Sequence, residues 1–196
     1  MFAWGVSLMS VWLVMGGSGR ATGTQPATRP AGNAATRPAP ATQPAVVLPF
    51  IEQSISGNTI IFPDAYAGKL VLVNFWASWC PFSRKELSYW RDAQIRYHEQ
   101  GLEILGVAVD KNKRGTLESL QKFLVDNSLP WEQIYDHAPE LAQMYQVDTL
   151  PTSLLVDGST GRIIARGQVL RRAGLARLIE ANLSKVAGDA STRPAP

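Results

Sequence analysis

The sequence predicts an α/β fold, in which a β-sheet is covered by helices on both faces. Two continuous apolar runs, Leu70–Phe75 and Leu102–Val109, are typical of strands that are buried on both faces. A helical pattern lies between them, because the apolar residues of Pro81–Gln100 recur every three or four positions. Strands that alternate with helices in this way indicate an α/β sheet.

The remaining elements follow from the same periodicities. Asn58–Phe62 comes directly after Gly57, which predicts the second arm of a hairpin. Thr116–Asp126 is predicted to be a helix with its leucines, Leu117, Leu120 and Leu124, on one face. Further along we expect a short helix, a hairpin around Asp157-Gly158 and a final helix: Pro139–Tyr145, Ser153–Val156 with Arg162–Arg166, and the stripe Leu175, Leu178, Ile179, Leu183 and Val186.

Composition divides the chain into a folded domain and three flanking segments. Residues 1–20 begin with an uncharged, largely apolar stretch, and we expect a signal peptide or membrane anchor there. Residues 21–45 are mostly Ala, Thr and Pro, which predicts a disordered linker. The folded domain is expected at 46–187, and a disordered tail at 188–196. This organisation predicts an extracytoplasmic protein, periplasmic or in the cell envelope, that is secreted or anchored by its N-terminal segment.

The net charge of +3 does not point to nucleic acid. Residues 46–187 hold 15 of the 19 Lys and Arg residues and 15 of the 16 Asp and Glu residues, so the predicted domain is neutral. The excess comes from arginines in the flanking segments. Since non-specific binding to nucleic acid depends on basic surface, we expect no nucleic-acid partner.

Cys80 is the only cysteine of the 196 residues. One thiol excludes an internal disulfide, a zinc site built on several cysteines and dithiol chemistry within one chain. Cys80 follows the first buried strand and precedes a predicted helix whose first position suits Pro81. The exposed N–H groups and partial positive charge of a helix N-terminus favour a thiolate. The placement predicts a reactive thiol, and a buried, inert cysteine is the alternative.

The two histidines do not add a metal site. His98 lies in a predicted helix and His137 in a loop, and neither has a second ligand at metal-binding spacing. The sequence also shows no glycine-rich phosphate loop and no Ser/His/Asp arrangement. We therefore expect neither a metal nor a cofactor.

Three stretches of the predicted domain share their pattern with a known family: Lys69–Glu86, which includes Trp79-Cys80-Pro81, then Gly106–Asp110, and Val147–Thr152. They resemble the thioredoxin superfamily, most closely its exported, often membrane-tethered TlpA/ResA-like branch. The similarity covers about residues 46–187, and the Asp157-Gly158 hairpin matches as well. The resemblance implies a thioredoxin-like fold, with a central mixed sheet flanked by helices on both faces.

The resemblance also implies roles around the sulfur of Cys80. Pro151 would be a cis-proline lying against the sulfur, and Leu150 would offer its backbone groups to an extended substrate. Asn74 stands where thioredoxin has a buried acid, so proton transfer by an aspartate at that position is not expected. The expected substrate-binding residues are Trp79, Pro81, Leu150, Pro151 and Thr152.

The chain departs from the family in the motif that performs the chemistry. The family has Cys-x-x-Cys, whereas this chain has Cys80-Pro81-Phe82-Ser83. The first cysteine normally attacks a substrate disulfide, and the second resolves the mixed disulfide that forms. Ser83 cannot resolve it, but its hydroxyl can donate a hydrogen bond to the Cys80 thiolate. We therefore predict a monothiol thiol–disulfide oxidoreductase with Cys80 and Ser83 as catalytic residues, acting on protein thiols or disulfides or on a small thiol, with an external thiol as the resolving group.

Two other functions stay open. The domain could be a catalytically inactive binding module that keeps the groove around Trp79 and Pro151 for a partner protein. It could also be a single-cysteine peroxidase, which the sequence favours least. Ala77 stands where peroxiredoxins have a threonine three residues before the cysteine, and the glutamine and Trp-Asn motifs of glutathione peroxidases are not found.

Overall fold

The computed structural model describes residues 46–110, 115–136 and 138–191. The segments 1–20 and 21–45, for which the sequence predicts an anchor or signal peptide and a linker, lie outside these residues. Within the described ranges, no helix has both the length and the apolar character that a membrane span requires.

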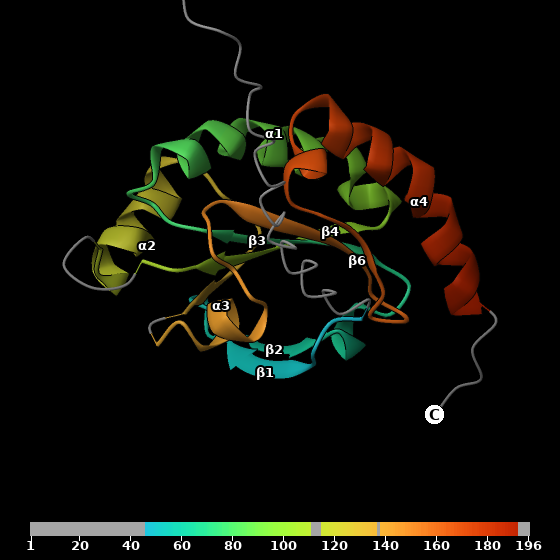
Figure 1. Ribbon diagram of the computed structural model, residues 1–196, viewed down its shortest axis with the longest axis horizontal. Coiled ribbons are helices and arrows are strands. Elements are labelled where there is room, and N and C mark those ends of the chain that lie inside the picture. The colour runs from blue at the N-terminus through green and yellow to red at the C-terminus, as the bar shows by residue number, and fades with distance from the viewer. Residues whose placement is uncertain (1–45, 111–114, 137, 192–196) are drawn as a thin grey trace, which may run out of the picture. The chain divides into compact units, whose positions relative to one another are not determined.

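A five-stranded mixed sheet forms the centre of the domain (Figure 1), in the order β5-β4-β3-β6-β7. The parallel pairs are β3 with β4 and β4 with β5, and the antiparallel pairs are β3 with β6 and β6 with β7. The strands span Leu70–Trp76 (β3), Leu102–Ala108 (β4), Glu132–Tyr135 (β5), Thr152–Asp157 (β6) and Ile163–Arg166 (β7). The expected mixed sheet is confirmed.

Each face of the sheet is covered by its own set of elements (Figure 1). One hydrophobic cluster joins the sheet to α1, α2 and α4. The other joins it to the hairpin β1–β2 and to α3. These elements span Pro81–Tyr97 (α1), Leu117–Asp126 (α2), Glu140–Met144 (α3), Ala173–Ser191 (α4), Phe50–Gln53 (β1) and Thr59–Phe62 (β2).

The apolar patterns of the sequence explain this layering. Every residue of β3 is buried, as expected of a central strand, and its side chains alternate between the two clusters. Leu72 and Trp76 face one cluster, while Val73 and Phe75 face the other. The predicted apolar face of α1 is also confirmed, since Leu87, Trp90, Ala93 and Tyr97 are all buried.

Three sequence expectations need correction. β5 was not predicted, because its residues Glu132–Tyr135 carry no strong strand pattern. Leu117 does not lie on the buried face of α2: it is 41% exposed at the first helical position, while Leu120 is fully buried. The last helix continues to Ser191, so the first part of the segment expected to be a disordered tail is helical.

The strand register decides where distant residues meet. β6 runs antiparallel to β3, and Thr152 at its start pairs with Phe75 near the end of β3. The residues that follow β3 and those that precede β6 therefore lie at the same edge of the sheet. Those residues include Cys80 and Pro151.

Candidate active site

Cys80 ends a tight turn and begins a long helix. Its N–H donates to the carbonyl of Ala77 at 3.1 Å, which closes the turn, and its own carbonyl accepts from the N–H of Arg84 at 3.1 Å. Cys80 is the N-cap residue of α1, a helix of 17 residues, and Pro81 occupies the first helical turn. The side chain of Cys80 thus lies at the N-terminus of α1. The residue is 6% exposed.

The Cys80 sulfur contacts the segment that precedes β6. Sγ lies 3.8 Å from the carbonyl oxygen of Leu150, a residue 70 positions away in the sequence. The peptide bond between Leu150 and Pro151 is cis. The hydroxyl of Thr152 donates to the carbonyl of Thr149 at 2.7 Å, so the segment has a hydrogen bond of its own across the proline. The structure therefore brings the thiol and the Leu150-Pro151-Thr152 segment together.

Ser83 does not contact the thiol in the way the sequence suggested. Its hydroxyl accepts a hydrogen bond from the backbone N–H of Ala77 at 3.4 Å and, within the described residues, forms none with Cys80. Ser83 is the third residue of the helix and is completely buried, and its side chain contacts the turn that begins at Ala77. Its hydroxyl supports the turn rather than the thiolate.

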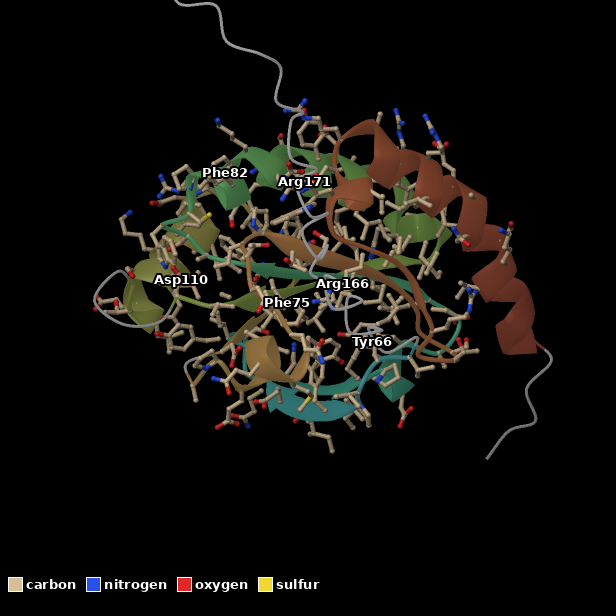
Figure 2. The ribbon with its side chains drawn as sticks, viewed as in Figure 1. Tyr66, Phe75, Phe82, Asp110, Arg166 and Arg171 are labelled. Carbon is tan, nitrogen blue, oxygen red and sulfur yellow. The ribbon has the colours of Figure 1, made fainter. Side chains whose placement is uncertain are left out.

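Exposed apolar residues flank Cys80 in the sequence. Trp79 is 36% exposed and Phe82 is 65% exposed, and Pro81 between them is exposed too. Phe82 lies at the same end of the sheet as Asp110, which Figure 2 shows. Exposed aromatic residues beside a buried sulfur give this end of the sheet a surface on which a polypeptide can rest.

Asp110 is a polar residue of this site that the sequence analysis did not single out. It lies two residues after the end of β4 and is completely buried. Its carboxylate accepts the backbone N–H of Ser78 at 3.0 Å to each oxygen, and it also accepts the Ser78 hydroxyl. One sequence signal could have found it, because the carboxyl ends of neighbouring parallel strands meet at one edge of a sheet. That edge is where Cys80 was expected.

Two further groups complete the polar surroundings. The Nε of Arg84 donates to the carbonyl of Ser78 at 2.6 Å, so α1 also holds the turn before Cys80. Asn74 is fully buried in β3, and its Oδ1 accepts from the hydroxyl of Ser153 at 2.7 Å. Asn74 carries no acidic proton, so it offers no buried acid to the thiol.

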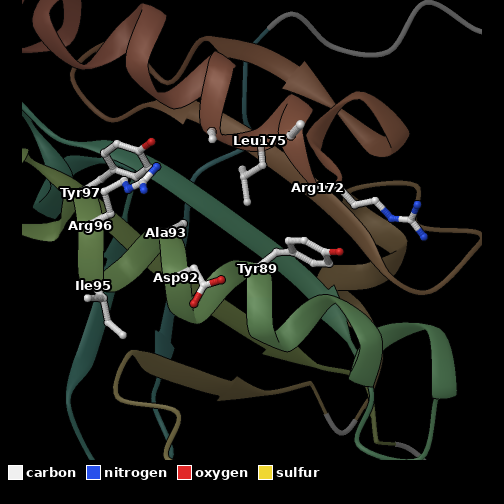
Figure 3. A pocket seen from close by; sticks show the side chains of 10 residues that line it. Tyr89, Asp92, Ala93, Ile95, Arg96, Tyr97, Arg172 and Leu175 are labelled. Atoms are coloured by element: carbon white, nitrogen blue, oxygen red, sulfur yellow. The ribbon is translucent and has the colours of Figure 1, made fainter.

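A groove of about 470 Å³ lies away from the sulfur, between α1 and α4. Figure 3 shows its walls, formed by Tyr89, Ala93 and Tyr97 of α1 and by Leu175 of α4. None of the site residues predicted from the sequence lines it. This groove is therefore separate from the candidate active site around Cys80.

Known proteins share both the sequence pattern and this architecture. The thiol-disulfide oxidoreductase ResA of Bacillus thuringiensis subspecies konkukian is 31% identical over 115 residues, which are 59% of this chain and 63% of the relative. The sporulation thiol-disulfide oxidoreductase A of Bacillus subtilis is 29% identical over 115 residues, 59% of this chain and 68% of that protein. The chain thus spans less than two thirds of the length of the first relative.

A solved structure gives the same result at the level of the fold. The thioredoxin domain of a thiol-disulfide oxidoreductase from Bacteroides vulgatus superposes with a TM-score of 0.62 at 26% identity, covering 74% of this chain and 99% of that domain. Residues 42–165 match the AhpC/TSA family, which is more than half of the chain. The sheet order, the two covering layers and these similarities agree, and the chain is a member of the AhpC/TSA family with a thioredoxin fold.

Proposed function

We propose that the protein is a thiol–disulfide oxidoreductase that acts through the single thiol of Cys80. One observation carries this proposal: the sulfur lies at the N-terminus of α1 and 3.8 Å from the carbonyl of Leu150, the residue before the cis-proline. The thiolate is the reactive form of a cysteine in disulfide exchange. Leu150 presents backbone groups beside it, to which an extended substrate segment can bind.

The reaction has two exchange steps. The Cys80 thiolate attacks one sulfur of a substrate disulfide, a new S–S bond forms, and the other substrate sulfur leaves as a thiolate that takes a proton from water. A second, external thiolate then attacks the mixed disulfide and forms a disulfide with the substrate sulfur. Cys80 leaves as a thiolate, so the enzyme returns to its starting state.

The resolving thiol comes from outside because the chain offers none. Cys80 is the only cysteine, and the residue one helical turn later is Ser83. Its buried hydroxyl accepts the Ala77 N–H and has no sulfur with which to form a disulfide. A small thiol or a protein dithiol supplies the second step.

The substrate is a polypeptide that binds across the exposed residues beside Cys80. Trp79 and Pro81 provide apolar contacts, and the Leu150–Thr152 segment provides backbone groups. Relatives named thiol-disulfide oxidoreductases support this class of substrate. With its apolar N-terminal segment, the protein would act outside the cytoplasm, in the periplasm or cell envelope, as a secreted or tethered domain.

A binding module is the second candidate, and the low exposure of Cys80 favours it. A residue that is 6% exposed can reach a disulfide only if the residues around it move, whereas a partner can contact the exposed side chain of Phe82 without such a movement. The peroxidase alternative lacks such support, because Ala77 carries no hydroxyl to bind a peroxide.

The lone thiol makes the proposal simple to test, because any thiol reaction of the folded chain reports Cys80. The protein is mixed with oxidised glutathione, and the mixed disulfide is followed by intact mass spectrometry. We expect the folded wild type to react at least about tenfold faster than the same chain unfolded in urea, because the fold holds the sulfur beside the backbone groups of Leu150 that would position the substrate. Cys80→Ala should gain no mass.

Equal rates for the folded and unfolded chain would reject the enzymatic proposal. The binding module would then be favoured if Cys80→Ala still bound its partner. Rapid conversion of Cys80 to a sulfenic acid by peroxide, without mixed-disulfide formation, would favour the peroxidase instead.

A further inference from the structure

The turn that carries Cys80 donates hydrogen bonds to a buried carboxylate, that of Asp110. Ser78, two residues before the cysteine, uses both of its donors on Asp110: the backbone N–H lies 3.0 Å from each carboxylate oxygen, and the hydroxyl donates to Oδ1. The two residues are 32 positions apart. This contact therefore joins the end of β4 to the turn that follows β3.

The remaining polar group of Ser78 is fixed as well. Its carbonyl accepts from Nε of Arg84 at 2.6 Å, and the Arg84 guanidinium lies 5.0 Å from the ring centre of Phe123 in α2. The backbone of Asp110 is held in turn by the hydroxyl of Tyr135, which donates to its carbonyl at 3.3 Å. Asp110 and Arg84 thus hold the turn directly, and β5 and α2 contact these two residues in turn. That turn precedes α1 and carries Cys80.

The carboxylate accepts all three of these bonds only in its ionised form. Both oxygens accept from Ser78, and a protonated carboxyl would present a donor at one of them. Among the described residues, the positive charge of Arg84 acts on the Asp110 carboxyl and favours its ionised form. Ser78 also favours it through two hydrogen bonds, but burial outweighs these effects and raises the pKa of Asp110 above its usual value. The group therefore takes up its proton at a higher pH than an ordinary aspartate.

We infer that Asp110 is a positioning residue for the Cys80 thiol: its ionised carboxylate holds the Ala77–Cys80 turn through Ser78 and so aims Sγ at the Leu150 carbonyl. The inference rests on the proposed exchange reaction at Cys80, whose rate depends on how the sulfur meets a substrate bound beside Leu150. A misplacement of about 1 Å is enough to cost a large factor in rate.

The first test is the variant Asp110→Asn, which keeps the shape but places an N–H₂ group against one of the Ser78 donors. At pH 8 we expect its exchange rate with an extended peptide disulfide to be about tenfold below that of the wild type. Removing a negative charge near the sulfur would by itself favour the thiolate, so a loss of rate reports position and not charge.

The pH profile separates positioning from a purely structural role. As the pH falls, Asp110 in the wild type takes up its proton, and the difference between the exchange rates of the wild type and Asp110→Asn should disappear. A ratio of the two exchange rates that is the same at all pH values, or equal rates throughout, would overturn the inference. Asp157→Asn is the matched control, because Asp157 is also a buried aspartate but lies at the other end of β6. Its exchange rate should equal that of the wild type.

Two additions keep the test decisive. If Asp110→Asn does not fold, Ser78→Ala removes only the hydroxyl donor, and about a threefold loss of rate is expected, with no loss counting against the inference. If wild-type Cys80 forms no mixed disulfide, the proposed function fails, and the positioning role is judged from alkylation by iodoacetamide, which needs no partner. A ratio of the alkylation rates of wild type and variant that varies with pH then supports the positioning role, and a constant ratio rejects it.

Discussion

Two turns at opposite ends of the central sheet are each held by a buried aspartate, yet they are built differently. At one end, Asp157 accepts the N–H of Ser159, two residues away, at 3.0 Å, and Arg162 lies 4.0 Å from its other oxygen. At the other end, Asp110 accepts from Ser78, which is 32 residues away. The first aspartate closes its own turn, while the second holds a turn from another part of the chain.

The difference shows how a local change can reach the thiol. The carboxylate of Asp157 makes its contacts within the hairpin between β6 and β7, so disturbing it should cost stability but leave Cys80 in place. The Asp110 contact joins β4, α1 and the turn before Cys80. Disturbing it should change the reaction more than the fold.

The largest effect on stability is expected for Gly158→Ala. A Cβ atom at this position would lie 2.0 Å from the carbonyl oxygen of Tyr66 and 2.9 Å from that of Lys69, so the backbone must move. We expect the free energy of unfolding in urea to fall by about 3 kcal/mol. The exchange rate of the remaining folded protein should not change, and a parallel loss of rate would show that the two ends of the sheet are coupled.

A smaller effect, on the reaction, is expected for Arg84→Lys. Lysine keeps the charge but loses the Nε–H that donates to the Ser78 carbonyl. Loss of a hydrogen bond worth about 1 kcal/mol corresponds to roughly a fivefold lower exchange rate. Arg162→Lys makes the same change beside Asp157 and should leave the rate unaltered. Similar exchange rates for the wild type, Arg84→Lys and Arg162→Lys would show that Arg84 does not help to position the thiol.

The smallest effect is a pH dependence of stability. Burial raises the pKa of Asp110 in the folded state, so the folded protein binds this proton more tightly than the unfolded chain does. Its stabilising contribution is complete below the unfolded pKa of about 4 and is lost as the pH rises through the folded pKa. The free energy of unfolding of the wild type, minus that of Asp110→Asn, should therefore fall across this window in urea titrations. A rise would contradict the assignment.

The parts of the fold that could be predicted from the sequence are those encoded locally. The apolar run of β3 and the three-to-four spacing of α1 are confirmed, because each buries its side chains within one element. β5 could not be predicted, since its burial depends on partners far along the chain. Its Gln133 is buried because the side chain accepts from Nε1 of Trp76 at 3.1 Å and lies over Gly106, where a Cβ would meet it at 2.0 Å.

The same distinction holds for the candidate site. The position of Cys80 at a helix N-terminus could be predicted from Pro81 and the preceding strand, because both lie next to it in the sequence. The approach of Leu150 came only from the resemblance to the thioredoxin superfamily. The contact of Asp110 with Ser78, and the choice of Ala77 as the partner of Ser83, depend on how the turn folds in three dimensions.

The central claim is that one thiol forms the mixed disulfide and the chain cannot resolve it. The most direct measurement follows the decay of a glutathione mixed disulfide at Cys80 with no external thiol present, in the wild type, in Ser83→Cys and in Ser83→Ala. The wild type and Ser83→Ala should keep the adduct. Ser83→Cys should release glutathione at least about 100-fold faster, because its introduced thiol is tethered one helical turn away. Equally fast release by the wild type would contradict the single-thiol account.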